Sequence, residues 1–260
     1  MLSKSLDVEK KSTEFRTSNK YLSSFADESM NSFLNECRSE KKWSFYLEEK
    51  NVRLFKRETQ GKYAEAKGVG ILPYPPSACM KMVMRSAHVS LKEPNKYASK
   101  LDPDKLESYI INDFTNNGHL TLEYMRFKGV PLVVTSRDFV NVTQWRMMND
   151  GSIFSCGSSA PQELQKKYCP SNSSYVRGDT IRGGWLFEPF GEGDRSSRVT
   201  LIICLDLKGL LPSWLIDQVT KTQPLCISTL KELLDQDVID TGCRNKEEYI
   251  DRDLASILRN

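Results

Sequence analysis

Few side chains in this sequence are of the types that catalyse reactions, and their spacing matches no common catalytic pattern. The two histidines, His88 and His119, lie in no motif with a serine or cysteine nucleophile. The sequence contains no G-x-S-x-G elbow and no P-loop, and Gly183–Gly184 is too short to cradle a phosphate. An enzyme would need acid and base groups that converge in a buried site, and Glu123 and Arg126 are the candidates. We therefore predict a protein without catalytic residues.

The cysteines indicate neither a disulfide framework nor a metal site. Their number, seven, is odd, and no two of them form a CxxC pair or join a histidine in a zinc-binding pattern. We therefore predict no metal ion, no cofactor and a reducing compartment. The cysteines are Cys37, Cys79, Cys156, Cys169, Cys204, Cys226 and Cys243.

The charge of the chain is balanced. It has 37 Lys and Arg residues against 34 Asp and Glu residues, which gives a formal net charge of +3. Mixed charge argues against a dedicated nucleic-acid binder and leaves room for weak attraction to anionic membrane surfaces. The first residues contain no apolar segment of signal-peptide length, and no later segment is long enough to span a membrane. These features predict a cytoplasmic protein that binds no nucleic acid.

Two consecutive segments near the carboxyl end would position a site in this chain. Residues 199–207 are apolar and rich in β-branched side chains, and the run is too short to span a membrane, so we predict a buried strand. After Pro212 the apolar residues recur at steps of three and four, which predicts an amphipathic helix. Pro224 removes one hydrogen bond from that helix and predicts a kink near Thr220. The apolar face of the helix carries Leu215, Val219, Cys226, Leu230 and Leu233.

Most of the remaining chain has the pattern of strands. Alternating apolar and polar residues predict three short strands within Trp43–Leu72 and six more within Leu106–Leu207. Helical spacing starts at about Ser24 and returns in a methionine-rich segment after Pro76, and a short helix is predicted within Leu91–Asp104. About nine strands with mostly short links predict an α+β domain built on a large antiparallel sheet.

Two features of this sheet favour an enclosed volume. An antiparallel sheet of that many strands tends to curl, and a curled sheet wrapped round a helix encloses space for side chains or for a ligand. The loop Lys128–Ser136 is apolar, although loops usually face water. The segment 161–174, by contrast, is polar and is expected to be a surface excursion.

Three segments resemble the StAR-related lipid-transfer (START) domain family. They are SRDFVNV at Ser136–Val142, IRGGWLFEP at Ile181–Pro189 and LDLKGLLPSWLIDQV at Leu205–Val219, and the resemblance extends over about 24–234. It implies a helix-grip fold, in which a curved antiparallel sheet surrounds a hydrophobic tunnel and the carboxyl-terminal helix, here Ser213–Leu234, closes it as a lid. The implied mobile loop beside the lid contains Gly129, Val130, Pro131 and Leu132.

The resemblance implies binding and transport rather than catalysis. Members of the family hold one lipid in the tunnel and exchange it at membranes, so we expect a monomeric carrier of a phospholipid such as phosphatidylcholine, in transient contact with membrane surfaces. The alternatives are a sterol carrier and, further away, an enzyme or a lipid sensor that uses the same tunnel. The implied lipid-binding residues are Glu123, Tyr124, Arg126, Phe139 and Trp185, and the implied lid residues are Trp214, Leu215, Val219, Pro224, Cys226 and Leu230.

The residues that would choose between these lipids depart from both branches of the family. In the phospholipid branch an arginine that binds the phosphate stands where this chain has Ala98, so Lys100 or Arg126 would have to replace it. In the sterol branch a buried glutamate pairs with an arginine. Thr143 occupies the place of that arginine, which leaves Glu123 without the expected partner.

Three further features have two interpretations each. Tyr124, Phe139 and Trp185 form an aromatic cage for a choline cation, or they pack in the core. Arg137–Asp138 is a salt-bridged strand start that anchors the mobile loop, or it contacts a lipid headgroup. Trp214 inserts into a bilayer, or it packs under the loop.

The resemblance also sets the expected domain boundaries. We predict a polar arm at 1–23, a START-like domain at 24–235 and a tail at 236–260. The tail is expected to contain a short amphipathic helix that docks on the domain, on a partner or on a membrane. The apolar residues of this helix are Ile250, Leu254, Ile257 and Leu258.

Overall fold

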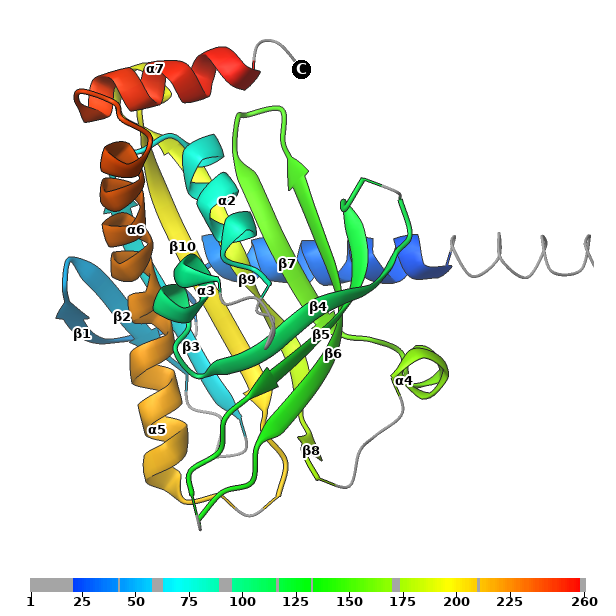
Figure 1. Ribbon diagram of the computed structural model, residues 1–260. Coiled ribbons are helices and arrows are strands. Elements are labelled where there is room, and N and C mark those ends of the chain that lie inside the picture. The colour runs from blue at the N-terminus through cyan, green and yellow to red at the C-terminus, as the bar shows by residue number, and fades with distance from the viewer. Residues whose placement is uncertain are drawn as a thin grey trace, which may run out of the picture.

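Ten strands in the described part of the chain form one curved sheet, and helices cover both of its faces (Figure 1). The α+β prediction is confirmed. The structure is a computed structural model. It describes residues 21–41, 43–57, 63–88, 95–115, 117–131, 133–169, 174–209 and 211–257, and side chains up to residue 252. Most of the predicted amino-terminal arm therefore lies outside the described residues.

The strands follow the order β1-β2-β3-β10-β9-β7-β6-β5-β4, and neighbours along this order are antiparallel. The nine strands predicted from alternation are all present, and the two-residue strand β8 pairs with β6 in parallel. The strands are β1 (Ser44–Glu49), β2 (Val52–Lys56), β3 (Ala64–Leu72), β4 (Lys105–Asp113), β5 (Leu120–Phe127), β6 (Arg137–Met147), β7 (Ile153–Ser159), β8 (Val176–Arg177), β9 (Asp179–Phe190) and β10 (Ser196–Asp206).

The helices are divided between the two sides of the sheet (Figure 1). A helix at residues 21–38 crosses behind the sheet, whereas α2, α3, α5 and α6 lie in front of it. In the predicted surface excursion the structure has an additional helix, α4. The labelled helices are α2 (Pro76–Arg85), α3 (Lys96–Leu101), α4 (Gln162–Tyr168), α5 (Ser213–Thr222), α6 (Cys226–Asp240) and α7 (Lys246–Ile257).

Strand alternation gives the sheet two faces with different neighbours. Successive side chains of a strand point to opposite faces. On β6, Val140 and Val142 pack in one cluster with Leu22 of the amino-terminal helix, whereas Phe139 points to the side on which α5 lies. We call the face that packs against α2, α5 and α6 the inner face, and the face under the amino-terminal helix the outer face.

The helix at 21–38 is fixed to the outer face through its carboxyl end. Lys67 Nζ, on β3, donates hydrogen bonds to the carbonyl oxygens of Glu36, Cys37 and Ser39 at 3.2, 2.7 and 2.9 Å. The last carbonyl groups of a helix have no partner within it, and a cation is favoured there. Because Lys67 is buried, these bonds also satisfy a charge that would otherwise be costly to bury.

The predicted kink in the lid is a break between two helices. A 3₁₀ turn at Gln223–Leu225 separates α5 from α6. Pro224 lies inside this turn and has no N–H to donate, so the break falls at the proline itself, a little after Thr220. The turn rests closely on β3, because a Cβ added at Gly68 would lie only 2.8 Å from the Pro224 Cβ. A glycine at this position therefore lets the lid approach the sheet.

The carboxyl half of the lid is anchored at Asp237. This residue is buried and accepts hydrogen bonds from Arg85 of α2 at 2.8 Å and from Tyr249 of α7 at 2.9 Å. Ile250 of α7 is buried in the same cluster as the apolar face of α6. The tail helix therefore docks on the domain, one of its three predicted placements. Since α6 continues to Asp240, the predicted boundary at 235 falls inside a helix.

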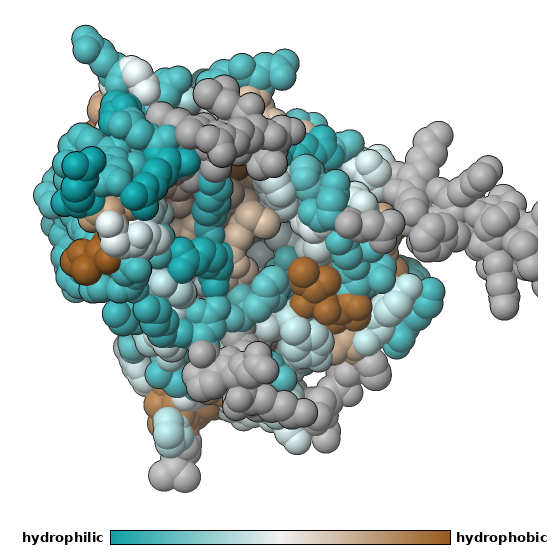
Figure 2. Space-filling view, turned by 45° about the horizontal axis from the view of Figure 1, so that its top comes forward, coloured by the Kyte–Doolittle hydropathy of each residue, from teal (hydrophilic) through white to brown (hydrophobic). Residues whose placement is uncertain are grey.

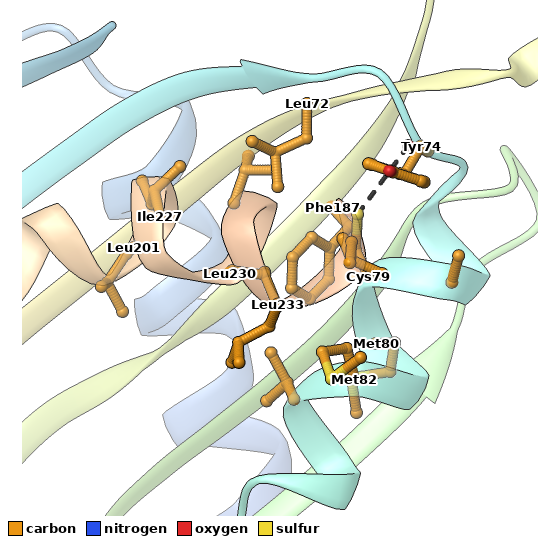
Figure 3. Packing of buried hydrophobic residues seen from close by; sticks show 14 of the residues in the cluster. Leu72, Tyr74, Cys79, Met80, Met82, Phe187, Leu201, Ile227, Leu230 and Leu233 are labelled. Carbon is orange, nitrogen blue, oxygen red and sulfur yellow. Dashed lines mark hydrogen bonds between the residues drawn. The ribbon is translucent and has the colours of Figure 1, made fainter. Parts of the chain in front are cut away.

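Side chains fill the space between α6, α2 and the sheet. Figure 3 shows Leu230 and Leu233 of α6 close to Phe187 of β9. Met80 and Met82 of α2 belong to the same cluster. Burial of each such side chain contributes about 1.5–3 kcal/mol. The α6 half of the lid thus covers a packed core, and any empty volume has to be sought under α5.

Candidate functional site

A pocket of about 230 Å³ lies under α5. Its walls come from α5, from the inner face of β5, β6 and β10, and from the loop 128–136. Most of the lining side chains are apolar, which is typical of sites for apolar ligands. The apolar lining residues are Phe127, Val130, Val134, Phe139, Leu205, Leu207, Leu215 and Val219.

The predicted lid residues of α5 lie at this pocket or beside it. Leu215 and Val219 line the pocket, and none of the residues of α5 is fully buried. Trp214, at the start of α5, is 48% exposed. An indole with this exposure is not packed under the loop 128–136.

The predicted lid residues after the break have structural neighbours instead. Pro224 is buried against Gly68, and Leu230 belongs to the packed core. The Cys226 Sγ donates a hydrogen bond to the Leu101 carbonyl oxygen at 3.1 Å. Burial raises the pKa of Cys226 to about 12, so this thiol stays protonated at neutral pH. The structure thus divides the predicted lid into a part that faces a pocket and a part that completes a core.

The loop 128–136 forms the wall opposite α5. Gly129 and Val130 line the pocket, as the resemblance implies, whereas Pro131 is exposed and Val133 is 57% exposed. Leu132 lies outside the described residues. A Cβ at Gly129 would overlap the backbone of the opposite arm of the loop, so a glycine is needed for the loop to close on itself.

Arg137 ties this loop to the linker before α5. Its guanidinium donates hydrogen bonds to the carbonyl oxygen of Thr135 in the loop, and to those of Leu207 and Lys208 in the linker at 3.3 and 3.4 Å. The residue is 8% exposed and lines the pocket. Sequence reasoning named Arg137 as an anchor of the loop, but it could not show that backbone carbonyls are the partners.

At the start of β6, Asp138 forms a salt bridge, whereas Arg137 forms none within the described part of the chain. Adjacent residues of a strand point to opposite faces, so Asp138 lies on the outer face. There its carboxylate accepts two hydrogen bonds from Arg177, at 2.9 and 2.8 Å. Arg137 is left without a carboxylate partner among the described residues.

Tyr124 and Arg126 also lie on the outer face. Tyr124 stacks on Tyr109 with ring centroids 5.1 Å apart, and Arg126 pairs with Glu107 at 3.3 Å. The sheet separates both residues from Phe139, which lines the pocket. The three aromatic residues considered for a choline cage therefore do not surround one volume.

Trp185 and Phe139 remain as aromatic residues of the inner face. Trp185 stacks on Phe187 with ring centroids 5.9 Å apart, and Phe139 contacts Phe127 edge to face at 5.7 Å. Sequence reasoning missed Phe127. The alternation of β5 could have found it, because Glu123 and Phe127 are an even number of residues apart and share a face.

A row of polar side chains crosses the inner face of β5 and β6. Glu123 accepts a hydrogen bond from Thr121 at 2.7 Å, and Asn141 is the cross-strand neighbour of Glu123. Asn141 is 4% exposed, and its Oδ1 has no hydrogen-bond partner among the described residues. Thr143 continues the row opposite Thr121. Because Arg126 lies on the other face, it does not converge with Glu123 as acid–base chemistry would require.

The inner face of the central strands is not completely covered. Thr143 on β6, Ser155 on β7 and Trp185 on β9 stay partly exposed, although the outer face of these strands is packed against the amino-terminal helix. Figure 2 shows the molecular surface hollowed near the middle of the view, with hydrophilic residues around the hollow and weakly hydrophobic ones in its depth. The curved sheet thus leaves space beside the filled core.

Asp102 is a partly buried acid that sequence reasoning did not select. It follows α3 and interacts with the side chain of Gln223, in the turn between α5 and α6. Burial raises the pKa of Asp102, while the nearby charge of Lys105 acts in the opposite direction. The only sequence signal was its place in the connector segment that ends at Leu101–Asp102.

No helix in the described residues has the length and apolar character needed to cross a bilayer. His, Cys, Asp and Glu side chains in the same residues form no group of three that could hold a metal ion.

A family model and two sequence relatives match this chain. The family model, described as START domain, matches residues 24–236. Steroidogenic acute regulatory-like protein 1 of Caenorhabditis elegans is 31% identical over 88 residues, which are 34% of this chain and 32% of that protein. StAR-related lipid transfer protein 5 of Bos taurus is 36% identical over 86 residues, 33% of this chain and 38% of that protein. The matched stretch thus spans about a third of the length of each curated relative.

Solved structures show a similar fold. Human StAR-related lipid transfer protein 5 superposes with a TM-score of 0.66 at 18% sequence identity, and the match covers 84% of this chain and 98% of that one. At this identity the likeness concerns the fold alone. It agrees with a curved antiparallel sheet closed by carboxyl-terminal helices.

Proposed function

Because this chain belongs to the START domain family, we propose that it is a lipid carrier. It holds one lipid, a phospholipid such as phosphatidylcholine, between the inner face of the sheet and α5, and it exchanges this lipid at membrane surfaces. The observation that carries the proposal is the apolar pocket under α5, at the end of the lid where the core is not filled.

The affinity of such a carrier comes from apolar contact. Removing apolar surface from water contributes about 25 cal/mol per Å², so each 100 Å² of acyl chain covered by the pocket contributes about 2.5 kcal/mol. Leu215 and Val219 on α5 and Phe139 on β6 supply such surface. No bond has to be made or broken, and release needs only that the cover opens.

The cover opens at α5. None of the residues of α5 is fully buried, whereas α6 is fixed to α2 and α7 through Asp237. Moving α6 would expose packed core, but moving α5 exposes only the pocket walls. The turn at Gln223–Leu225 is therefore the hinge of the lid, and Pro224 is the residue at which the helical hydrogen bonds are interrupted.

The same end of the molecule meets the membrane. Trp214 at the start of α5 and Val133 in the loop 128–136 are exposed apolar side chains, and they belong to the two segments that wall the pocket without lining it themselves. Tryptophan is favoured at membrane–water interfaces. Contact of these two side chains with a bilayer would pull the walls apart where the lipid leaves.

A sterol is the second candidate ligand, and the polar row on the inner face favours it. Among the described residues Asn141 Oδ1 has no hydrogen-bond partner and Glu123 accepts a hydrogen bond from Thr121, so both can accept one from a sterol hydroxyl. The phospholipid assignment is instead supported by Arg137, which lines the pocket and has no carboxylate partner among the described residues. A single assay should compare the two ligands directly.

Transfer between vesicles tests the proposal. Donor vesicles carry either a fluorescent phosphatidylcholine or a fluorescent sterol, and acceptor vesicles carry a quencher. We expect the protein to accelerate transfer of the phosphatidylcholine more than that of the sterol. The reverse order would establish the sterol alternative, and no acceleration of either lipid would refute the carrier function.

A further inference from the structure

Arg137 is a buried cation in an otherwise largely apolar pocket. It is 8% exposed, and no Asp or Glu in the described residues lies within 4.0 Å of its guanidinium. Burial lowers the pKa of Arg137, and no neighbouring negative charge offsets this effect. A buried charge is usually paired, because desolvation is costly. The described residues therefore supply no counterion to this charge, since Asp104, which also lines the pocket, pairs with Lys128.

Three other cations, Lys128, Arg126 and Lys100, are paired or lie away from the pocket. Lys128 lines the pocket but pairs with Asp104 at 2.8 Å. Arg126, one of the two replacements predicted for the missing arginine at Ala98, lies on the outer face and pairs with Glu107. Lys100, the other replacement, is exposed and does not line the pocket. These placements leave Arg137 as the unpaired cation of this pocket.

The guanidinium of Arg137 also has N–H donors that the hydrogen bonds to the protein do not use. An arginine presents five N–H donors, and three hydrogen bonds occupy it, all to backbone carbonyls of Thr135, Leu207 and Lys208. Phosphate oxygens match the remaining donors of such a fork. The pocket volume of about 230 Å³ is below the range of sites for whole drug-sized ligands, so it suits one end of a lipid.

We propose that Arg137 binds the phosphate group of the lipid, which places the headgroup at the α5 end of the site, between α5 and the loop 128–136. The acyl chains then extend along the inner face toward Trp185 and the central strands. This inference rests on the proposed carrier function and specifies which end of the lipid lies at the opening. It also assigns the phosphate to a residue on β6 instead of the connector position that Ala98 occupies.

Lipid extraction by the full chain tests the phosphate contact. The vesicles contain diacylglycerol, phosphatidic acid or phosphatidylcholine with the same acyl chains, and the variants are Arg137→Gln, Arg137→Lys and the control Arg126→Gln. We expect Arg137→Gln to lower extraction of both phospholipids on the order of 10-fold, with diacylglycerol extraction changed by less than about 2-fold. Arg137→Lys should recover part of the loss, and Arg126→Gln should behave as wild type.

Three results would overturn the phosphate contact. The first is an equal loss of all three lipids in Arg137→Gln, because a purely structural tie between the loop and the linker predicts that. The second is a selective loss in Arg126→Gln. The third is thermal stabilisation by inorganic phosphate that depends on Arg137 without any preference for phospholipid over diacylglycerol, because the site would then bind free phosphate. If the wild-type chain extracts none of the three lipids, the result refutes the proposed carrier function, on which the phosphate contact rests.

Cross-linking of the wild-type chain tests the orientation even if the Arg137 variants do not fold. One phosphatidylcholine probe carries a photoreactive group on the choline, and the control probe carries it at the end of an acyl chain. We expect the choline probe to label peptides that contain the loop 128–136 or α5. The chain-end probe should label β7 or β9. Exchange of these two patterns would overturn the proposed orientation while leaving the carrier function intact.

Discussion

Replacement of Gly68 by alanine tests the hinge of the lid. The added Cβ would lie 2.8 Å from the Cβ of Pro224, 3.2 Å from the Pro224 carbonyl oxygen and 3.2 Å from the Cδ1 of Ile227, so that Pro224 bears the closest contact. Carbon atoms pack best at about 3.5–4.0 Å, so the turn between α5 and α6 has to move away from β3 by roughly 1 Å. The substitution thus pushes directly on the segment that we propose as the hinge.

The magnitude follows from the cost of overpacking. Extra methyl groups in a packed site cost about 1–3 kcal/mol. A closed lid bears this cost and an open lid does not, so the closed-to-open ratio should fall roughly 5- to 150-fold. The free energy of unfolding should change less, because replacing glycine by alanine also removes about 0.4–1 kcal/mol of unfolded-state conformational entropy.

The assay is lipid transfer between vesicles together with a thermal melt. Gly68→Ala should release lipid at least about 5-fold faster than wild type. The matched control is Gly70→Ala, on the same face of the same strand, where the added Cβ would lie 3.0 Å from Ile227 of the anchored helix α6. This control should lower the melting temperature without accelerating release. Equal release rates in the two variants would refute the assignment of the hinge.

Three other substitutions test the anchor at Asp237, the membrane contact of Trp214 and the partly buried acid Asp102. Asp237→Ala should lower the free energy of unfolding by about 2 kcal/mol and the melting temperature in calorimetry by roughly 4–8 °C, because it removes the carboxylate that accepts hydrogen bonds from Arg85 and Tyr249. If Asp235→Ala, at a more exposed residue of α6, lowered the melting temperature as much, the role of Asp237 as an anchor would be contradicted. Trp214→Ala should weaken sedimentation with vesicles but leave the melting temperature unchanged; normal sedimentation argues against insertion. Burial raises the pKa of Asp102, so its protonation stabilises the folded state at acid pH, and this stabilisation is lost as the pH rises through the raised pKa. Asp102→Asn should therefore raise the melting temperature at pH 7 and raise it less toward pH 4. A difference in melting temperature that does not depend on pH would contradict the upward direction of the pKa shift.

Periodicity predicted the sheet and the lid because both depend on local patterns. Alternation gave all nine long strands, and the helical spacing after Pro212 gave the covering helix. The missing N–H of Pro224 located the break to within a few residues. The two-residue strand β8 and the helix α4 escaped detection, because α4 buries none of its residues and so has no apolar stripe to recognise.

The site was harder to predict because it depends on faces and on backbone partners. Glu123 and Tyr124 are adjacent on one strand, so they cannot both point inward, and strict use of alternation would have removed Tyr124 and Arg126. The partners of Arg137 are carbonyl groups, which every residue carries and no sequence pattern marks. Filling of the α6 half of the lid depends on packing between distant segments, such as Leu230 against Phe187.

Native mass spectrometry of the purified full chain, after incubation with vesicles of mixed phosphatidylcholine and sterol, tests the central claim most directly. We predict a complex with a single bound lipid whose mass excess equals that of one phosphatidylcholine. A mass excess of one sterol would contradict the phospholipid assignment. A chain that carries no lipid after this exposure would contradict the carrier function itself.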